Sequence, residues 1–259
     1  MGLKKIAICS ALLFSVNVTA EELSISVHDF PPFITVDEGR VTGVFVDIVD
    51  RVSAATKIDT KIYLYPNRRS KSVLKEGKVN ANFPLGWNKE RDKWLYWSLP
   101  LMSTEYGFFT RASERDEFNE IDDFSGQKVG VFGPSNTSYS LEMLSEELEA
   151  RGLEPLHIQM LPNSNGQNFR KLMDNRIDAV FHNQDTGRSQ LERFNIKGVV
   201  YAFGAKKLNY YIGFSKEHTD KKLVDRFNLG LEKLQSSGEL GDIVRSYNLR
   251  PINEDTNVR

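Results

Sequence analysis

The sequence predicts an α/β protein of two lobes joined by two extended connecting segments. Three observations predict this fold class. Strand-like and helix-like periodicity alternate along most of the 259 residues, which is typical of parallel sheets covered by helices on both faces. Extended segments rich in apolar and aromatic residues occur near 105–112 and 204–213. Two consecutive helices end the pattern, and with no strand after them they need an earlier sheet to pack on.

The first twenty residues predict a secretory signal peptide, and hence a periplasmic location. Lys4 and Lys5 precede a short apolar stretch over residues 6–16, which ends in small residues. We expect cleavage before Glu21. Cys9 is the only cysteine, and it lies too early in the apolar stretch for lipidation. The mature chain is therefore expected to fold without disulfides.

The first set of alternating units covers residues 23–85. Leu23 and Ile25 alternate with serines, which is the period of a strand. Phe45, Ile48 and Val52 lie on one face of a helix. The expected strands are 23–28, 58–64 and 79–85, and the expected helices are 43–56 and 67–76.

A second set of units covers residues 128–203. Residues 128–132 form a short apolar run, typical of a buried strand. Leu141, Leu144 and Leu148 share one face of a predicted helix. The expected helices are 137–151, 169–173 and 186–194, and further extended segments are 155–161, 177–181 and 199–203.

The C-terminal segment carries two apolar stripes at helical spacing, over residues 224–234 and 240–247, with Gly238 between them. We expect both helices to pack on the first lobe. The expected domains are therefore a signal peptide (1–20), lobe 1 (21–108 and 207–259) and lobe 2 (109–206).

The composition excludes several classes of function. The 34 basic and 35 acidic residues are interspersed and give a formal charge of -1, so no footprint for nucleic acid or an anionic membrane is present. The four histidines, at positions 28, 157, 182 and 218, lack zinc-binding spacing. No phosphate-binding glycine loop occurs, and no segment is long and apolar enough to span a bilayer. We expect no metal and no cofactor.

Six motifs occur in order along the chain. They are Asp29-Phe30-Pro31-Pro32-Phe33, residues 43–48, residues 74–80, Lys89-Glu90-Arg91 before Ser98-Leu99-Pro100, residues 128–132 and residues 176–180. Together they resemble the type II periplasmic solute-binding proteins of the polar-amino-acid class, solute-binding protein family 3, over essentially the whole mature chain. The resemblance implies the periplasmic binding protein-like II fold, with two Rossmann-like lobes joined by a two-strand hinge. It also implies a monomer that delivers a small solute to an inner-membrane ABC permease or sensor.

The resemblance assigns the solute's carboxylate to Arg91, because a guanidinium offers two parallel donors that match a carboxylate. The alternative is an ordinary surface arginine within the charged run 89–93. Ser135, Asn136 and Thr137 begin the helix opposite, where free backbone N–H groups attract anions. The same residue types are also ordinary helix N-caps.

Asn183 and Asp185 follow a predicted strand, at the end where open α/β sheets bind ligands. In amino-acid binders of the family an aspartate at the position of Asn183 pairs with the solute's ammonium group. Asn183 therefore departs from the amino-acid pattern, and Asp185 is either a ligand contact or a helix cap. Gly86 and Trp87 stand where the family often has small hydroxyl residues, which also indicates a changed ligand.

Phe30 matches a family position that stacks on the solute, and Trp87 is a second candidate wall of the pocket. Phe33 is expected in the core instead. Asn67 and Arg68 begin the second helix and are further candidate contacts. A second arginine in the cleft would favour a solute with two acidic groups, although an exposed surface position is the more ordinary one.

Three functions remain open. The leading hypothesis is a non-catalytic binder that closes its lobes around a carboxylate-bearing, amino-acid-like solute. The second is an enzyme on the same scaffold, such as a dehydratase of small carboxylic acids, with His182 or Asp185 as acid or base. The third is an interaction domain with an empty cleft, which the departures at Asn183 and Gly86 suggest.

Overall fold

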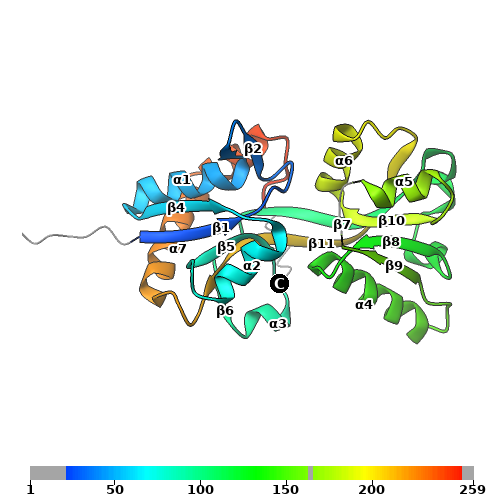
Figure 1. Ribbon diagram of the computed structural model, residues 1–259, viewed down its shortest axis with the longest axis horizontal. Coiled ribbons are helices and arrows are strands. Elements are labelled where there is room, and N and C mark those ends of the chain that lie inside the picture. The colour runs from blue at the N-terminus through cyan, green and yellow to red at the C-terminus, as the bar shows by residue number, and fades with distance from the viewer. Residues whose placement is uncertain (1–21, 163–165, 253–259) are drawn as a thin grey trace, which may run out of the picture.

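The computed structural model describes residues 22–162 and 166–252. The predicted signal peptide lies outside these residues. A mixed sheet runs through the molecule in the order β4-β1-β5-β11-β7-β10-β8-β9, with β6 beside β11. Figure 1 shows a group of helices around each end of this sheet, and two long strands that connect the groups. This arrangement confirms the predicted α/β fold of two Rossmann-like lobes on a two-strand hinge.

The first lobe contains the parallel strands that the periodicity predicts. β1 pairs in parallel with β4 on one side and β5 on the other. The apolar faces of these strands and of α1 are buried, including Leu23, Ile25, Phe45, Ile48 and Val52. The elements are β1 (Glu22–Val27), α1 (Val44–Thr56), β4 (Asp59–Leu64), α2 (Asn67–Lys75) and β5 (Ala81–Gly86).

The second lobe repeats this architecture. β8 pairs in parallel with β9 and β10, and Leu141 and Leu148 of α4 are buried in the core, as their spacing predicts. The elements are β8 (Lys128–Phe132), α4 (Asn136–Ala150), β9 (His157–Leu161), α5 (Gln167–Met173), β10 (Ala179–Asn183) and α6 (Gln184–Arg193).

Two antiparallel strands, β7 (Met102–Arg111) and β11 (Val199–Ser215), cross from one lobe to the other. β7 pairs antiparallel with β10, and β11 pairs antiparallel with β5. The sheet is therefore mixed, and not parallel throughout as the strand–helix alternation predicts. The predicted strand 199–203 and the connection 204–213 form one continuous strand. Its register with β7 shifts between Tyr201 and Phe203 and between Gly204 and Lys206, but the pairing continues on both sides of each shift.

The last two helices, α7 (Lys221–Ser236) and α8 (Glu239–Ser246), pack beside α1 (Figure 1). Gly230 of α7 lies so close to Val52 and Thr56 that a Cβ atom there would meet their side chains. The hydroxyl of Tyr247 donates a 2.6 Å hydrogen bond to Asp47 of α1. The chain thus returns to the lobe that holds its first strand.

Several short elements have no periodicity of their own and were not expected from the sequence. They are β2 (Thr35–Asp37), β3 (Arg40–Thr42), α3 (Lys89–Asp92), β6 (Leu95–Trp97) and the 3-10 helices η1 (Ala112–Glu117) and η2 (Ile121–Phe124). The four-residue helix α3 matters most, because it carries Arg91. In the described part of the chain, no helix has the length and apolar character needed to cross a membrane.

Candidate functional site

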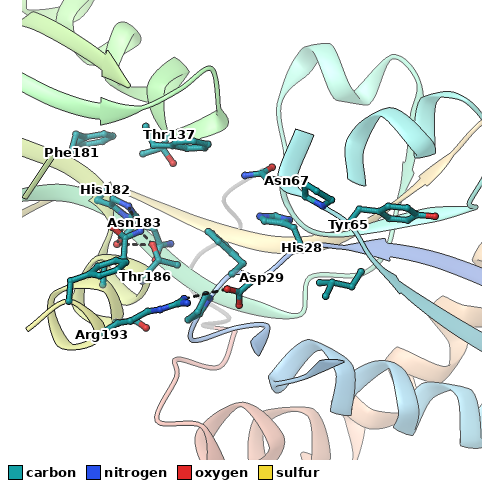
Figure 2. A pocket seen from close by; sticks show the side chains of 18 residues that line it. His28, Asp29, Tyr65, Asn67, Thr137, Phe181, His182, Asn183, Thr186 and Arg193 are labelled. Atoms are coloured by element: carbon teal, nitrogen blue, oxygen red, sulfur yellow. Dashed lines mark hydrogen bonds and ion pairs between the residues drawn. The ribbon is translucent and has the colours of Figure 1, made fainter. Parts of the chain in front are cut away.

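A cavity of about 490 Å³ lies between the two lobes. Figure 2 shows His28, Asp29, Tyr65 and Asn67 on one side and residues of β10 and α6 on the other. Much of the wall is aromatic, because Phe30, Tyr65, Phe132, Phe181 and Phe194 contribute to it. Of the residues singled out from the sequence, the structure places Phe30, Asn67, Thr137 and Asn183 in this lining.

Two buried polar atoms, in first-lobe residues that contribute to the lining, have no hydrogen-bond partner among the described residues. They are Nδ1 of His28, a residue only 8% exposed, and Oδ1 of Asn67. Burial, with a smaller contribution from Lys71, lowers the pKa of His28 to about 4. The imidazole is therefore neutral at pH 7. Because buried polar groups are nearly always hydrogen-bonded, these two atoms are exceptions among the described residues.

The opposite wall contains a second neutral histidine. His182 of β10 contacts the Thr186 hydroxyl through Nδ1 at 2.9 Å and the Gln190 amide through Nε2 at 3.3 Å. Burial lowers its pKa to about 4. Both ring nitrogens are thus engaged by neighbours, which makes His182 a poor candidate for the acid or base of an enzyme.

Arg91, the predicted carboxylate ligand, is not among the residues that line this cavity, and its side chain is partly buried. The backbone N–H of Arg91 donates to Oδ1 of Asn88, the cap of α3, at 2.9 Å, and Nη1 donates to the carbonyl of Gly86 at 2.8 Å. The buried rings of Tyr106 and Tyr210 lie beside the guanidinium, and burial lowers the pKa of Arg91. No carboxylate among the described residues forms an ion pair with it. A cation held in this way lacks a counter-anion.

Lys71 is a second partly buried cation that the sequence reasoning missed, although it does not line the cavity. Burial, together with repulsion from Arg91, lowers its pKa to about 8, and Lys71 also acts electrostatically on His28. It forms no ion pair within residues 22–162 and 166–252. Lys71 lies one helical turn after Asn67 on α2, so the i, i+4 spacing from a candidate contact was the available signal. Arg68 was the predicted cation here, but its side chain is exposed and does not line the cavity.

Two polar contacts join the lobes at residues Asn88 and Asp29 of the first lobe. The amide of Asn88 donates a 2.9 Å hydrogen bond to Asn136 at the start of α4. Arg193 of α6 forms an ion pair with Asp29 at 3.3 Å, drawn as a dashed line in Figure 2. Gly86 also meets Asn136, whose Nδ2 would be 2.6 Å from a Cβ atom at position 86. Asn136 thereby reaches the two residues that hold Arg91, Gly86 and Asn88.

Asn183 is buried and fully hydrogen-bonded. Its Oδ1 caps α6 by accepting from the N–H groups of Asp185 and Thr186, at 2.9 and 3.0 Å. Its Nδ2 donates to Thr104 at 2.7 Å and to the hydroxyl of Tyr210 at 3.2 Å. The amide therefore connects β10 to both hinge strands, although its residue also contributes to the cavity lining.

The remaining candidates have structural contacts of their own. Ser135 caps α4, accepting from the N–H of Ser138 at 3.1 Å and donating to the Phe132 carbonyl at 2.8 Å. Trp87 donates through Nε1 to Asp92 at 3.1 Å.

Asp185 and Phe33 also lie outside the cavity lining. Asp185 accepts a 2.8 Å hydrogen bond from Thr104, and its carboxylate lies 3.7 Å from Arg250. Thr104 and Arg250 line a separate, smaller cavity. Phe33 is completely buried in the core, where it was expected.

The fold and this site define a class of protein. Two α/β lobes face each other across a polar and aromatic cavity, and two paired strands cross between them. This is the architecture of the periplasmic binding protein-like proteins. Among the described residues, no cluster of three or more histidine, cysteine, aspartate or glutamate side chains is arranged to hold a metal ion.

The comparison with protein families identifies the family. The model of the bacterial extracellular solute-binding proteins, family 3, matches residues 23–250, and the chain belongs to this family. The predicted resemblance is therefore confirmed. A search of curated proteins found no match.

Solved structures share the fold at low sequence identity. A histidine kinase sensor domain with similarity to periplasmic binding proteins aligns with a TM-score of 0.73 and 19% identity, over 89% of this chain and 98% of that chain. A second structure is that of the probable amino-acid ABC transporter extracellular-binding protein YtmK of Bacillus subtilis. It aligns with a TM-score of 0.75 and 16% sequence identity, over 88% of this chain and 98% of that chain. A mutant of ArgBP from T. maritima aligns with a TM-score of 0.68 and 21% sequence identity, over 88% of this chain and 95% of that chain.

Proposed function

We propose that this protein works in the periplasm, where it captures a small carboxylate-bearing solute by hinge closure and presents it to an inner-membrane ABC importer or sensor. One observation carries the proposal. The partly buried guanidinium of Arg91 lies near Tyr106 and Tyr210 of the hinge strands, and no carboxylate of the described residues forms an ion pair with it. A carboxylate on the solute would supply the missing charge and accept two parallel hydrogen bonds.

The contacts between the lobes support closure as the capture step. Residues 21–108 and 207–259 would move as one lobe and residues 109–206 as the other. The contact between Asn88 and Asn136 would break when the lobes separate. A solute could then reach Arg91 from the open side, and Asn136 would return over it on closure. In this scheme the closed form is the one that the membrane partner recognises.

The partner class follows from the relatives. The compared proteins include the substrate-binding protein of an amino acid ABC transporter and a histidine kinase sensor domain. In our proposal either kind of partner would recognise the closed state, so an importer and a sensor fit the same closure step. We propose a monomer that acts without a metal or cofactor.

A thermal-shift screen of the mature chain over amino acids, monocarboxylates and dicarboxylates tests this function. A solute at one hundred times its Kd should raise the free energy of unfolding by about 3 kcal/mol. Arg91→Met should abolish that stabilisation, whereas Arg40→Met, on the exposed β2–β3 hairpin, should preserve it. Full stabilisation of the Arg91 variant would remove Arg91 from the site. Recovery of a chemically altered solute would favour the enzyme hypothesis instead.

A further inference from the structure

We infer that helix α6 holds the two lobes together through an ion pair at each of its ends, so that the protein closes reversibly without solute and opens as the ionic strength rises. This inference goes beyond the proposed function, because it requires no solute and does not involve Arg91. It follows from the positions of four charged side chains, two on α6 and two on the first lobe.

The C-terminal end of α6 is joined to the first lobe beside the cavity. Nη1 of Arg193, in the last turn of the helix, lies 3.3 Å from Oδ2 of Asp29, which follows β1 (Figure 2). Both residues line the interlobe cavity. Their side chains are 57% and 44% exposed, so the pair is accessible to ions of the medium. A solute that enters the cavity here requires this pair to open.

The N-terminal end of α6 is joined to the first lobe by the reverse arrangement of charges. Asp185, in the first turn, lies 3.7 Å from Nη2 of Arg250, in the segment that follows α8. The carbonyl of Arg250 accepts a 3.2 Å hydrogen bond from the N–H of Ser103 at the start of β7. The Asp185 carboxylate is also held by the hydroxyl of Thr104 at 2.8 Å. An acid of α6 therefore meets a base of the first lobe at this end.

The two ends lie far enough apart to hold the helix in direction as well as in position. Asp185 and Arg193 are eight residues apart, and a helix rises about 1.5 Å per residue, so they are about 12 Å apart along the axis. Thr186, Ser189 and Gln190 between them line the cavity. The two pairs thus bring this part of the second-lobe wall against the first lobe.

First-lobe partners, and not the helix charges alone, indicate an interlobe role. An acid in the first turn and a base in the last turn stabilise any helix through its dipole, and that effect is the same whether the lobes are open or closed. The contacts to Asp29 and Arg250 exist only when the lobes are together. They use groups of the protein alone, so they favour the closed form before a solute binds.

The expected effect is modest and depends on salt. An exposed ion pair should raise the ratio of closed to open molecules by about 1.4-fold to fivefold. Mobile ions screen such pairs, so the ratio should fall as salt is added. The interlobe hydrogen bond between Asn88 and Asn136 is uncharged and should not respond in this way.

Single-molecule fluorescence energy transfer on the solute-free chain 21–259 measures the ratio. Cys9 is the only cysteine, so labels can be placed on Asp37→Cys in β2 and Lys197→Cys after α6. Both positions are exposed, and β2 and α6 lie on facing lobes (Figure 1). Refolding from denaturant removes solute carried through purification. We expect the closed fraction to fall between about 10 mM and about 500 mM NaCl.

Substitutions assign the salt dependence to the two pairs. Arg193→Gln and Arg250→Gln should each lower the ratio at low salt by about 1.4-fold to fivefold, and the double variant should lose most of the salt dependence. Lys61→Gln serves as the matched control. It removes a similarly exposed ion pair with Glu22 that lies within the first lobe, and it should leave the ratio unchanged.

A charge exchange tests the contact directly. Asp29→Arg and Arg193→Asp, made singly, place like charges opposite each other and should each lower the ratio. Combined, they restore an attractive pair with the charges exchanged, so the double variant should recover a ratio above that of either single variant. Failure of the double variant to recover would overturn the inference.

Other results would also overturn it. These are a closed fraction that does not respond to salt or to the substitutions, a solute-free chain that stays wholly open or wholly closed at every salt concentration, and equal effects of Lys61→Gln and Arg193→Gln. Each of these results would leave the proposed function intact, since that function is tested by the stabilisation that a solute gives through Arg91.

Discussion

The amide of Asn183 donates a hydrogen bond to the hydroxyl of Tyr210 across 3.2 Å, from the end of β10 to the hinge strand β11. Tyr210 is buried and also lies beside the guanidinium of Arg91. A hydrogen bond thus connects the second lobe to a hinge residue that acts electrostatically on the partly buried Arg91 of the first lobe. The hinge is therefore part of the site, as well as the axis about which the lobes move.

Asn183→Ala should destabilise the protein by about 2–4 kcal/mol. The change removes a helix cap, which contributes about 1 kcal/mol. It also leaves the buried groups of Thr104 and Tyr210 with one partner fewer, which costs about 1–3 kcal/mol. Urea unfolding at constant m-value would measure the difference.

A matched control isolates the contribution of the cap. Asp220→Ala removes the N-cap of α7, which accepts only from the N–H of Lys222 and is solvent-exposed. This variant should lose about 1 kcal/mol or less. Equal losses in the two variants would show that the contacts of Asn183 to the hinge contribute nothing to stability.

Gly86→Ala should shift the protein toward a more open state. A Cβ atom at this position would lie 2.6 Å from Nδ2 of Asn136 and 3.1 Å from Leu208. Because Asn136 belongs to the other lobe, moving α4 away from β5 relieves the first of these clashes. Small-angle X-ray scattering without solute should show a larger radius of gyration, with little change in the free energy of unfolding.

Adding Asn136→Ala to the Gly86→Ala variant should restore the compact form. It removes the side chain that the new methyl group would meet, so the double variant should recover the compact form. Persistence of the open form in the double variant would assign the effect to Leu208, within the hinge, and would reject the contact between the lobes as its cause.

Stability should fall as the pH is lowered from about 6.5 to about 4, and His28 should account for part of the loss. The unfolded histidine titrates near 6.5, whereas burial lowers the pKa of His28 to about 4 in the folded state. Within this window the unfolded chain binds more protons, so acid favours unfolding. The complete difference in pKa corresponds to about 3 kcal/mol.

His28→Gln should reduce that acid-induced loss of stability, because glutamine does not titrate. Chemical unfolding measured near pH 7 and near pH 4.5 gives the loss for each variant. His157→Gln replaces an exposed histidine and serves as the control. A pH dependence that is the same for His28→Gln and the unmodified protein would show that the imidazole is accessible to protons in the folded state.

Local patterns were sufficient to predict most of the regular elements. Helix α1 and strand β8 carry their apolar residues at the period of the structure they adopt, because one face of each must be buried. Helix α3 has only four residues and buries none of them, so it has no apolar periodicity from which it could be predicted. It forms where Asn88 caps the turn that carries Arg91.

The site was harder to predict than the fold. Arg91 was found through a motif, and Phe30, Asn67, Thr137 and Asn183 through their places at strand ends and helix starts. Lys71 was missed, because a lysine on a polar helix has an ordinary exposed position as its usual state. Asp185 was expected as a ligand contact, but its carboxylate is directed to Thr104. The direction in which such a side chain points depends on packing between elements that are distant in the chain.

The sequence by itself determined the family, the order of strands and helices in each lobe, and the arginine that carries the proposed function. These depend on local periodicity and on short motifs. Only the tertiary structure decided that β11 is one continuous strand through both lobes, that Arg91 acts electrostatically on the partly buried Lys71, and that Asn183 is hydrogen-bonded to the hinge. The reason is physical. Burial, charge pairing and strand partnership arise between residues far apart in the chain, and no pattern within a single segment records them.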